Sequence, residues 1–195
     1  AEALKKAIND NFWVEEDGYY ASYLYGRQNL TRTQQSETLG ESFCVLFGIA
    51  DEDRAAKVIS SMPVGEFGPP IFSPQIVSQP DYHNNGVWPY VTSFWGKAAA
   101  KAGNETALMH ALACNVRTAS IYATNYENYS FNTGNPYTTQ INSPNMLWGL
   151  SGFMGLFHRT FFGLEFTKEG LALKPFVPTV LAGTRKLEAF PYRGM

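Results

Sequence analysis

The chain has 195 residues, 45% of them hydrophobic, and its 15 Lys and Arg against 17 Asp and Glu leave a formal net charge of −2. This length allows one or two domains with a packed core, and the balanced charge gives no electrostatic reason to expect nucleic acid. The most apolar stretch, 146–157, is shorter than the roughly 20 residues of a membrane span and contains three glycines. We therefore expect a soluble globular chain without membrane insertion.

The first third of the chain predicts three helices and one extended segment. Helices are expected over 1–13, 38–49 and 52–62, where apolar residues recur at helical spacing. Asp51 caps the third helix, and the aromatic segment 18–26 is typical of a strand or an extended loop. Because only a few residues join the second and third helices, they predict an antiparallel helical hairpin.

The middle of the chain predicts a second hairpin between two long loops. Residues 62–81 contain five prolines and no helical period, and so long a loop in a compact domain is usually functional. A helix over 88–103 follows, with its proline in the first turn, and Asn104 caps the next helix. A polar and aromatic loop over 122–142 comes after that hairpin.

Residues 143–161 predict the last helix, which is apolar on nearly every side. Gly149, Gly152 and Gly155 recur in it every three residues, although each glycine costs a helix about 1 kcal/mol relative to alanine. Close approach of another helix is the simplest reason for such a row. We therefore expect an inner, buried helix.

The pattern changes to alternation after Gly170, which predicts short strands. Apolar and polar residues alternate over 171–181 and again over 185–192. We expect a helical part over 1–168 and a short β segment over 169–195. Because a terminal strand without a partner is unfavourable, that segment would be the start of a longer β region.

Other chemistries find little support in the sequence. Cys44 and Cys114 lie in helical patterns outside any CxxC, so buried free thiols are the simplest interpretation. His110 and His158 have no second ligand at metal spacing, and neither a GxSxG nor a nucleotide-binding glycine loop occurs. We expect no metal and no cofactor.

Aromatic residues make up 15% of the chain and gather in segments that also hold Asn, Gly and Pro, such as 82–90 and 122–137. Aromatic faces pack on the C–H surface of a sugar ring, and amides form hydrogen bonds with its hydroxyls. The mixture indicates a sugar pocket, with ordinary loop packing as the alternative.

Two motifs carry a resemblance to a known family. YHNNGVWP at 82–89 looks like the YHNGxVWP signature of six-hairpin glycosidases, the (α/α)6 toroids that include debranching-type amylo-glucosidases. ENYSFNTG at 127–134 matches the ExYxxxTG segment of the glucosidase I and trehalase-like branch, where a Trp-bearing inner helix follows as it does here. Either motif alone is weak, whereas the two in this order are specific.

The resemblance implies a mainly α fold, a partial (α/α)6 toroid built of helical hairpins with short strands at its C-terminal end. The chain supplies about half of the helices that a full toroid needs, so it would be the C-terminal half of the catalytic barrel. The last residues, LEAFPYRGM at 187–195, look like the entry to the β-rich stretch that often follows the toroid.

In that branch the glutamate of ExYxxxTG is the general base of an inverting glycosidase, a role that falls to Glu127 here. Inversion needs a second, protonated carboxyl roughly 6.5–9.5 Å away on the other face of the sugar. The branch has an upstream aspartate for this, expected outside the chain; Asp81, Glu37 and Glu41 are weaker candidates within it. The alternative for Glu127 is an ordinary solvated loop carboxylate.

Five residues near the motifs are candidates for sugar binding. Trp88 and Trp148 can serve as platforms for sugar rings, with packing as the alternative for Trp148. His83 and Asn84 can bond sugar hydroxyls, with a structural bond to the backbone as the alternative for His83, and Tyr82 belongs to the same loop. The second Asn before the glycine departs from the family motif and changes how this loop closes.

Three functions follow from these patterns. The first is a fragment of a glycoside hydrolase that acts on α-linked gluco- or related oligosaccharides, with the rest of its own barrel as partner and no turnover by the half alone. The second is a non-catalytic helical module that binds glycans, and the third is a scaffold for protein interactions. No residue shows the compartment, although a bacterial periplasm would suit an enzyme that degrades polysaccharides.

Overall fold

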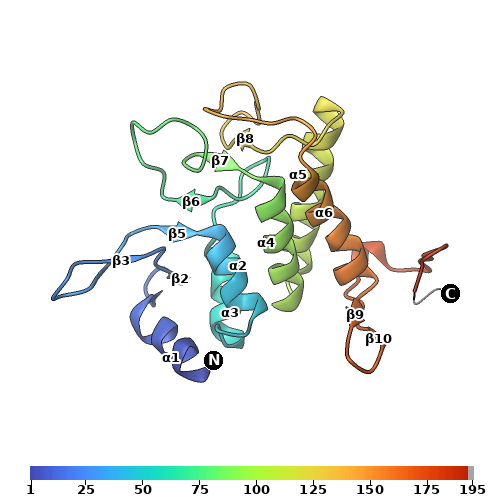
Figure 1. Ribbon diagram of the computed structural model, residues 1–195, viewed down its shortest axis with the longest axis horizontal. Helices are drawn as coiled ribbons and strands as arrows, with labels where there is room; N and C mark the ends of the chain where they lie inside the picture. Colours follow the sequence, from blue (N-terminus) through green and yellow to red (C-terminus); the bar gives the residue numbers. More distant parts are fainter. Residues whose placement is uncertain (193–195) are drawn as a thin grey trace.

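The computed structural model describes residues 1–192, which are mainly helical, as expected (Figure 1). A π-helical turn, Phe157–Phe161, continues the last helix, and a 3-10 turn covers Thr179–Leu181. The α-helices are α1 (Glu2–Asn11), α2 (Thr38–Leu46), α3 (Glu52–Ser61), α4 (Pro89–Lys101), α5 (Glu105–Tyr122) and α6 (Leu147–Leu156). In the part of the chain that is described, no helix has both the length and the apolarity needed to cross a membrane.

The strands are only two or three residues long and pair as antiparallel two-stranded ladders. Such short ladders are too small to be independent sheets, so they act as links between loops. They pair β1 (Trp13–Val14) with β2 (Tyr19–Tyr20), β3 (Leu24–Tyr25) with β4 (Thr31–Arg32), β5 (Ser36–Glu37) with β6 (Phe72–Ser73), β7 (Gly86–Val87) with β8 (Tyr129–Ser130), and β9 (Leu164–Phe166) with β10 (Leu171–Leu173).

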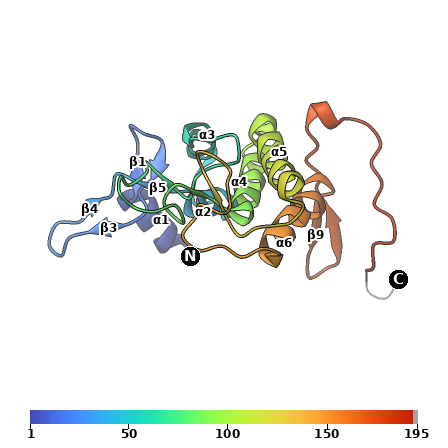
Figure 2. The ribbon, with the colours of Figure 1, turned by 90° about the horizontal axis from the view of Figure 1, so that it is seen from above.

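Three of the helices, α2, α4 and α6, form a row. The central helix α4 packs against α2 on one side and α6 on the other, while α3 packs against α2 and α5 against α4. Figure 2 shows α3 and α5 on the same side of this row. In Figure 1 all three helices of the row begin at the side where β5, β6, β7 and β8 lie. The two helical hairpins predicted from the sequence are thus confirmed.

The main core lies between these helices. Trp95 and Ala98 of α4, Leu108 of α5 and Leu156 of α6 are at most 2% exposed and belong to one continuous cluster. Burial of apolar surface at this junction is the main stabilising force in the fold. Both cysteines are buried free thiols, as expected, and burial raises the pKa of each to about 12.

The glycine row of α6 faces α4, which confirms the expected close approach of another helix. A Cβ added at Gly152 would lie 3.1 Å from the Ser93 side chain, and one added at Gly155 would lie 2.7 Å from Lys97 Nζ. Any larger residue at either position would therefore displace a side chain of α4.

The opposite face of α6 is exposed, so the expectation that this helix is buried all round is wrong for the described chain. Leu147 is 76% exposed, and Leu150 and Met154 are 41% and 42% exposed. The sequence shows that these residues are apolar, but it does not show whether a neighbour covers them.

Several predicted boundaries also shift. The first helix ends at Asn11 rather than at residue 13, because Trp13 enters the β1 ladder. Segment 18–26 holds two strands of separate ladders instead of one. The last helix starts at Leu147, since Asn145 has a left-handed φ of 62° that interrupts any earlier start.

The predicted C-terminal strands are correct only in part. Leu171–Leu173 is a strand and pairs with Leu164–Phe166. Within 171–181, Thr179–Leu181 is a 3-10 turn. Residues 185–192 form no strand. Residues 193–195 of the predicted β segment lie outside the described residues.

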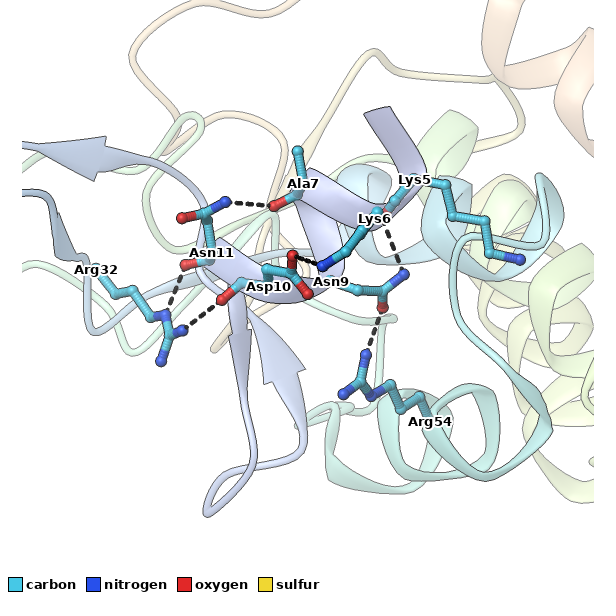
Figure 3. A network of polar contacts seen from close by, with 8 residues as sticks. All are labelled: Lys5, Lys6, Ala7, Asn9, Asp10, Asn11, Arg32 and Arg54. Atoms are coloured by element: carbon cyan, nitrogen blue, oxygen red, sulfur yellow. Dashed lines mark hydrogen bonds and ion pairs between the residues drawn. The ribbon is translucent and has the colours of Figure 1, made fainter. Parts of the chain in front are cut away.

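Helix α1 is attached to the rest of the fold by polar contacts, and none of its residues is buried. Figure 3 shows Arg54 Nη1 donating to Asn9 Oδ1 (2.6 Å) and Arg32 Nε donating to the Asn11 carbonyl (2.6 Å). Asn9 Oδ1 also accepts from the Tyr20 hydroxyl (2.8 Å). These bonds hold α1 beside the turn between α2 and α3, and the half-buried Ile8 of α1 packs against the main core.

Candidate functional site

Three loops meet at the N-terminal ends of α2, α4 and α6. They cover residues 12–37, 62–88 and 123–146, and each leads into one of these helices (Figure 1). The β5–β6 ladder joins the first loop to the second, and the β7–β8 ladder joins the second to the third. Functional side chains commonly lie on loops that a rigid scaffold positions in this way.

The β7–β8 ladder brings the two sequence motifs into direct contact. Gly86 pairs with Ser130, and Val87 pairs with Tyr129. Val87 is 1% exposed and Tyr129 is fully buried, so each motif contributes a buried side chain where they pair. The segments 82–89 and 127–134 therefore form one structural unit although they lie far apart in the chain.

Steric constraints explain why Gly86 and Gly134 of the two motifs are glycines. A Cβ on Gly86 would lie 1.7 Å from the Tyr82 carbonyl oxygen, which leaves no room for any other residue. A Cβ on Gly134 would lie 2.4 Å from the Phe67 ring, and its φ of +66° also favours glycine. Both glycines permit the tight folding of the loops around the site.

The additional asparagine of the first motif closes a turn. Asn85 has a left-handed φ of 49°, which asparagine tolerates better than most residues. Its side-chain amide donates to Asp81 Oδ1 (2.8 Å), and the Asp81 carbonyl accepts from Gln140 N (2.8 Å). Asp81 therefore holds the turn together, the ordinary role for a loop aspartate.

Glu127 lies next to Tyr82 in this unit. The Tyr82 hydroxyl donates to Glu127 Oε1 at 3.5 Å, and Glu127 is only 9% exposed. Burial, followed by the negative charge of Glu127, raises the pKa of the Tyr82 hydroxyl. Glu127 is thus a buried carboxylate with one tyrosine beside it, and the alternative of a solvated loop glutamate does not describe its surroundings.

Two asparagines fix the backbone that carries Glu127. Asn142 Nδ2 donates to the Asn128 carbonyl (2.7 Å), and Asn128 N donates to Asn142 Oδ1 (3.3 Å). Glu127 N donates to the Ser143 carbonyl (2.9 Å). These hydrogen bonds join residues 127–128 to residues 142–143 and so fix the position of the Glu127 backbone.

An aromatic cluster lies beside Glu127 and combines four of the predicted sugar-binding residues. The Tyr82 ring lies 4.6 Å from the His83 ring and 5.2 Å from the Trp88 ring, measured between centroids. Trp88 lies 5.7 Å from Trp148, which stacks on Tyr90 at 5.5 Å with an interplanar angle of 21°. Trp148 is 39% exposed and His83 is exposed, so these two rings are accessible to a ligand.

Two of the five candidate side chains, Asn84 and Trp88, already have structural partners. Asn84 is buried; its Oδ1 accepts from Ile76 N (2.7 Å), and its Nδ2 donates to the carbonyls of Ile76 and Gln79 (3.1 Å each). Trp88 is 6% exposed, and its Nε1 donates to the Tyr82 carbonyl (3.0 Å). Asn84 and Trp88 therefore shape the loop that carries Tyr82 and His83.

A cavity of about 710 Å³ lies beside His83 and Asn84. Its lining includes Glu37 and Glu41, which sequence reasoning placed only among weaker acid candidates. Two carboxylates four residues apart at the start of a helix share one face, and this spacing is the signal that could have indicated their proximity.

Both carboxyls have unusual surroundings. Glu37 caps α2 and accepts from the backbone N–H groups of Leu39 and Gly40 (3.1 and 2.6 Å), yet burial raises its pKa. Glu41 is 1% exposed; its Oε1 accepts from Tyr20 N (2.7 Å), while its Oε2 has no hydrogen-bond partner. Burial therefore raises the pKa of Glu41 well above its usual range.

Comparisons with known proteins do not assign a family to the chain. No protein-family model matches it, and no curated protein matches its sequence.

Proposed function

We propose that this chain is the C-terminal half of the catalytic barrel of an inverting glycoside hydrolase, with Glu127 as general base. The main support for the proposal is the position of Glu127: it is buried and bonded to Tyr82, whose ring lies 4.6 Å from the exposed ring of His83. A carboxylate next to accessible aromatic faces is what hydrolysis of a glycoside requires on one side of the sugar.

The arrangement of helices supports the barrel. In an (α/α)6 toroid, parallel inner helices alternate with outer helices, and the loops at one end of the inner helices form the active site. The row of α2, α4 and α6, with α3 and α5 on one side, has this alternation (Figure 2). The three loops that carry the motifs lie at the N-terminal end of the row.

In the proposed reaction Glu127 removes a proton from a water molecule that attacks the anomeric carbon. Tyr82 orients the carboxylate through its hydroxyl, and Trp148 with His83 provides the surface on which the sugar lies. The substrate would be an α-linked gluco- or related oligosaccharide. No nucleic acid, metal or cofactor takes part.

The general acid would come from the rest of the barrel, which is the partner that this half requires. Asp81 is engaged with Asn85 in a turn, and Glu37 is engaged as the cap of α2. The exposed apolar face of α6 is where further helices of the barrel would pack.

A second candidate is a helical module that binds glycans without hydrolysis. The accessible stack of Trp148 on Tyr90 favours it, since such a platform binds a sugar ring whether or not an acid is present. Binding of oligosaccharides by the complete protein, with no hydrolysis of any of them, would favour this candidate.

The proposed function is tested with the complete protein on a panel of α- and β-glycosides, with the first-formed product followed by proton NMR. We expect hydrolysis of an α-linked glucoside and release of the β-anomer, since a base-activated water attacks from the opposite face. Release of the α-anomer would contradict an inverting mechanism.

A further inference from the structure

Four basic side chains line a cavity of about 530 Å³ at the end of the helix row opposite Glu127. They are Lys97 and Lys101 of α4, Arg159 of the turn that follows α6, and Lys174 after β10. The only carboxylate among the lining residues is that of Glu165. The cavity is therefore strongly positive, although the whole chain has a formal net charge of −2.

Three of these cations have partners within the protein. Lys101 Nζ donates to the last carbonyl of α2 (2.8 Å), and Arg159 Nη1 donates to the first carbonyl of β9 (3.0 Å). Lys174 forms an ion pair with Glu165 (2.8 Å). Because each of these three side chains already has a structural partner, they alone would not indicate a ligand.

Lys97 differs from the other three. Its ammonium lies 4.7 Å from the centre of the Phe94 ring and fits into the space left by Gly155. Among residues 1–192 it has no hydrogen bond and no ion pair, although it is partly buried. Burial, followed by the positive charge of Arg159, lowers its pKa. Removing a cation from water without an anionic partner is unfavourable. A bound anion beside Lys97 would offset this cost.

We propose that this cavity binds the phosphate group of a small phosphorylated molecule. A phosphate dianion can bond with Lys97 and Arg159 together, and multiple charge-assisted bonds of this kind are the strongest that such an anion forms. The cavity volume lies within the range of ligand pockets, so it has room for an organic part as large as a monosaccharide. The site is separate from Glu127 and does not rest on the proposed glycosidase activity.

The test is calorimetric titration of the purified protein at low salt with three probes: inorganic phosphate, glucose 6-phosphate and glucose. We expect both phosphates to bind and glucose not to bind at this site. Lys97→Met keeps the aliphatic stem and removes the charge, and should weaken phosphate binding about tenfold or more, whereas the exposed-lysine control Lys168→Met should not. Tighter binding of glucose 6-phosphate would identify an organic phosphate; equal binding would identify the free ion.

A second measurement separates binding from a structural role of Lys97. Because a bound dianion stabilises the charged form of the amine, the pKa of Lys97 followed by NMR should rise when phosphate is added. Arg159→Gln should also weaken phosphate binding. If Lys97→Met fails to fold, the affinity of Arg159→Gln tests the proposed site. Absence of phosphate binding, or equal affinity in the wild type and both variants, would overturn the proposal.

Discussion

At the scale of single residues, Glu127 and Glu41 are both buried carboxyls with different environments. Glu127 accepts a bond from a tyrosine hydroxyl beside exposed aromatic rings. Glu41 lines a mostly apolar cavity, and its Oε2 has no hydrogen-bond partner. The second kind of environment raises the pKa of the carboxyl, because burial disfavours its charged form.

The Glu41→Gln variant tests this assignment. Since the folded pKa of Glu41 is raised above the ordinary value of 4.5, its contribution to stability is complete below that pH and is lost as pH rises toward the folded pKa. A glutamine side chain cannot ionise, so the variant should gain stability relative to the wild type as pH rises, by about 1.4 kcal/mol for each unit of pKa shift.

Urea unfolding at a series of pH values measures this difference, with Glu169→Gln as the exposed control. A difference between Glu41→Gln and the wild type that stays constant from pH 4 to pH 9 would show that the pKa of Glu41 is not raised in the folded protein.

The motifs identified Glu127 and the aromatic loop from the sequence, but not the contact between Tyr82 and Glu127. These two residues are 45 positions apart, and their proximity depends on a two-residue ladder that has no periodic signal. The hydrogen bonds of Asn84 could not be predicted from the sequence either. In the structure its amide bonds to the backbone of its own loop.

At the scale of elements, local signals predicted the helices well. Asn104 and Asp51 cap α5 and α3 through bonds to the N–H groups of Ala107 and Arg54 (2.9 Å each), and caps of this kind can be identified from the sequence. The alternation over 185–192 predicted a strand that does not form, because alternation describes only which face of a strand each residue would occupy.

Helix α4 packs closely against its neighbours at Gly96. A Cβ on Gly96 would lie 2.9 Å from Ala111 and 3.1 Å from Leu156, between α5 and α6. We expect Gly96→Ala to destabilise the protein by about 1–3 kcal/mol through overpacking. A Cβ on Gly149 would make only an ordinary 3.6 Å contact with Pro89, so the matched Gly149→Ala should be neutral or stabilising by up to about 1 kcal/mol.

Chemical denaturation of both variants measures the effect. Equal stability of Gly96→Ala and the wild type would mean that α4 is not in tight contact with its two neighbours.

At the scale of the whole molecule, the sequence pattern predicted hairpins and their order, whereas the placement of one hairpin against the next depends on tertiary packing. The glycine row indicated that some helix approaches α6, and the structure identifies it as α4. The exposure of Leu147 and its neighbours on the other face could not be predicted, because hydrophobicity alone does not specify what covers a surface.

If the chain is half of a barrel, it should not act alone. We expect residues 1–195, expressed as an isolated protein, to give no hydrolysis of any glycoside, because the general acid and half of the sugar pocket are missing. A sensitive assay for released reducing sugar checks this. Detectable hydrolysis that disappears in Glu127→Gln would contradict the proposed division of the active site.

The most direct test of the account is the rate of glycoside hydrolysis by the complete protein and by its Glu127→Gln variant, with exposed Glu169→Gln as control. Glutamine keeps the size of the side chain and its bond with Tyr82 but cannot accept a proton from water. We expect a loss of about 10²–10⁴-fold in rate with oligosaccharide affinity retained. Equal rates for the wild type and Glu127→Gln would show that Glu127 is only a structural carboxylate.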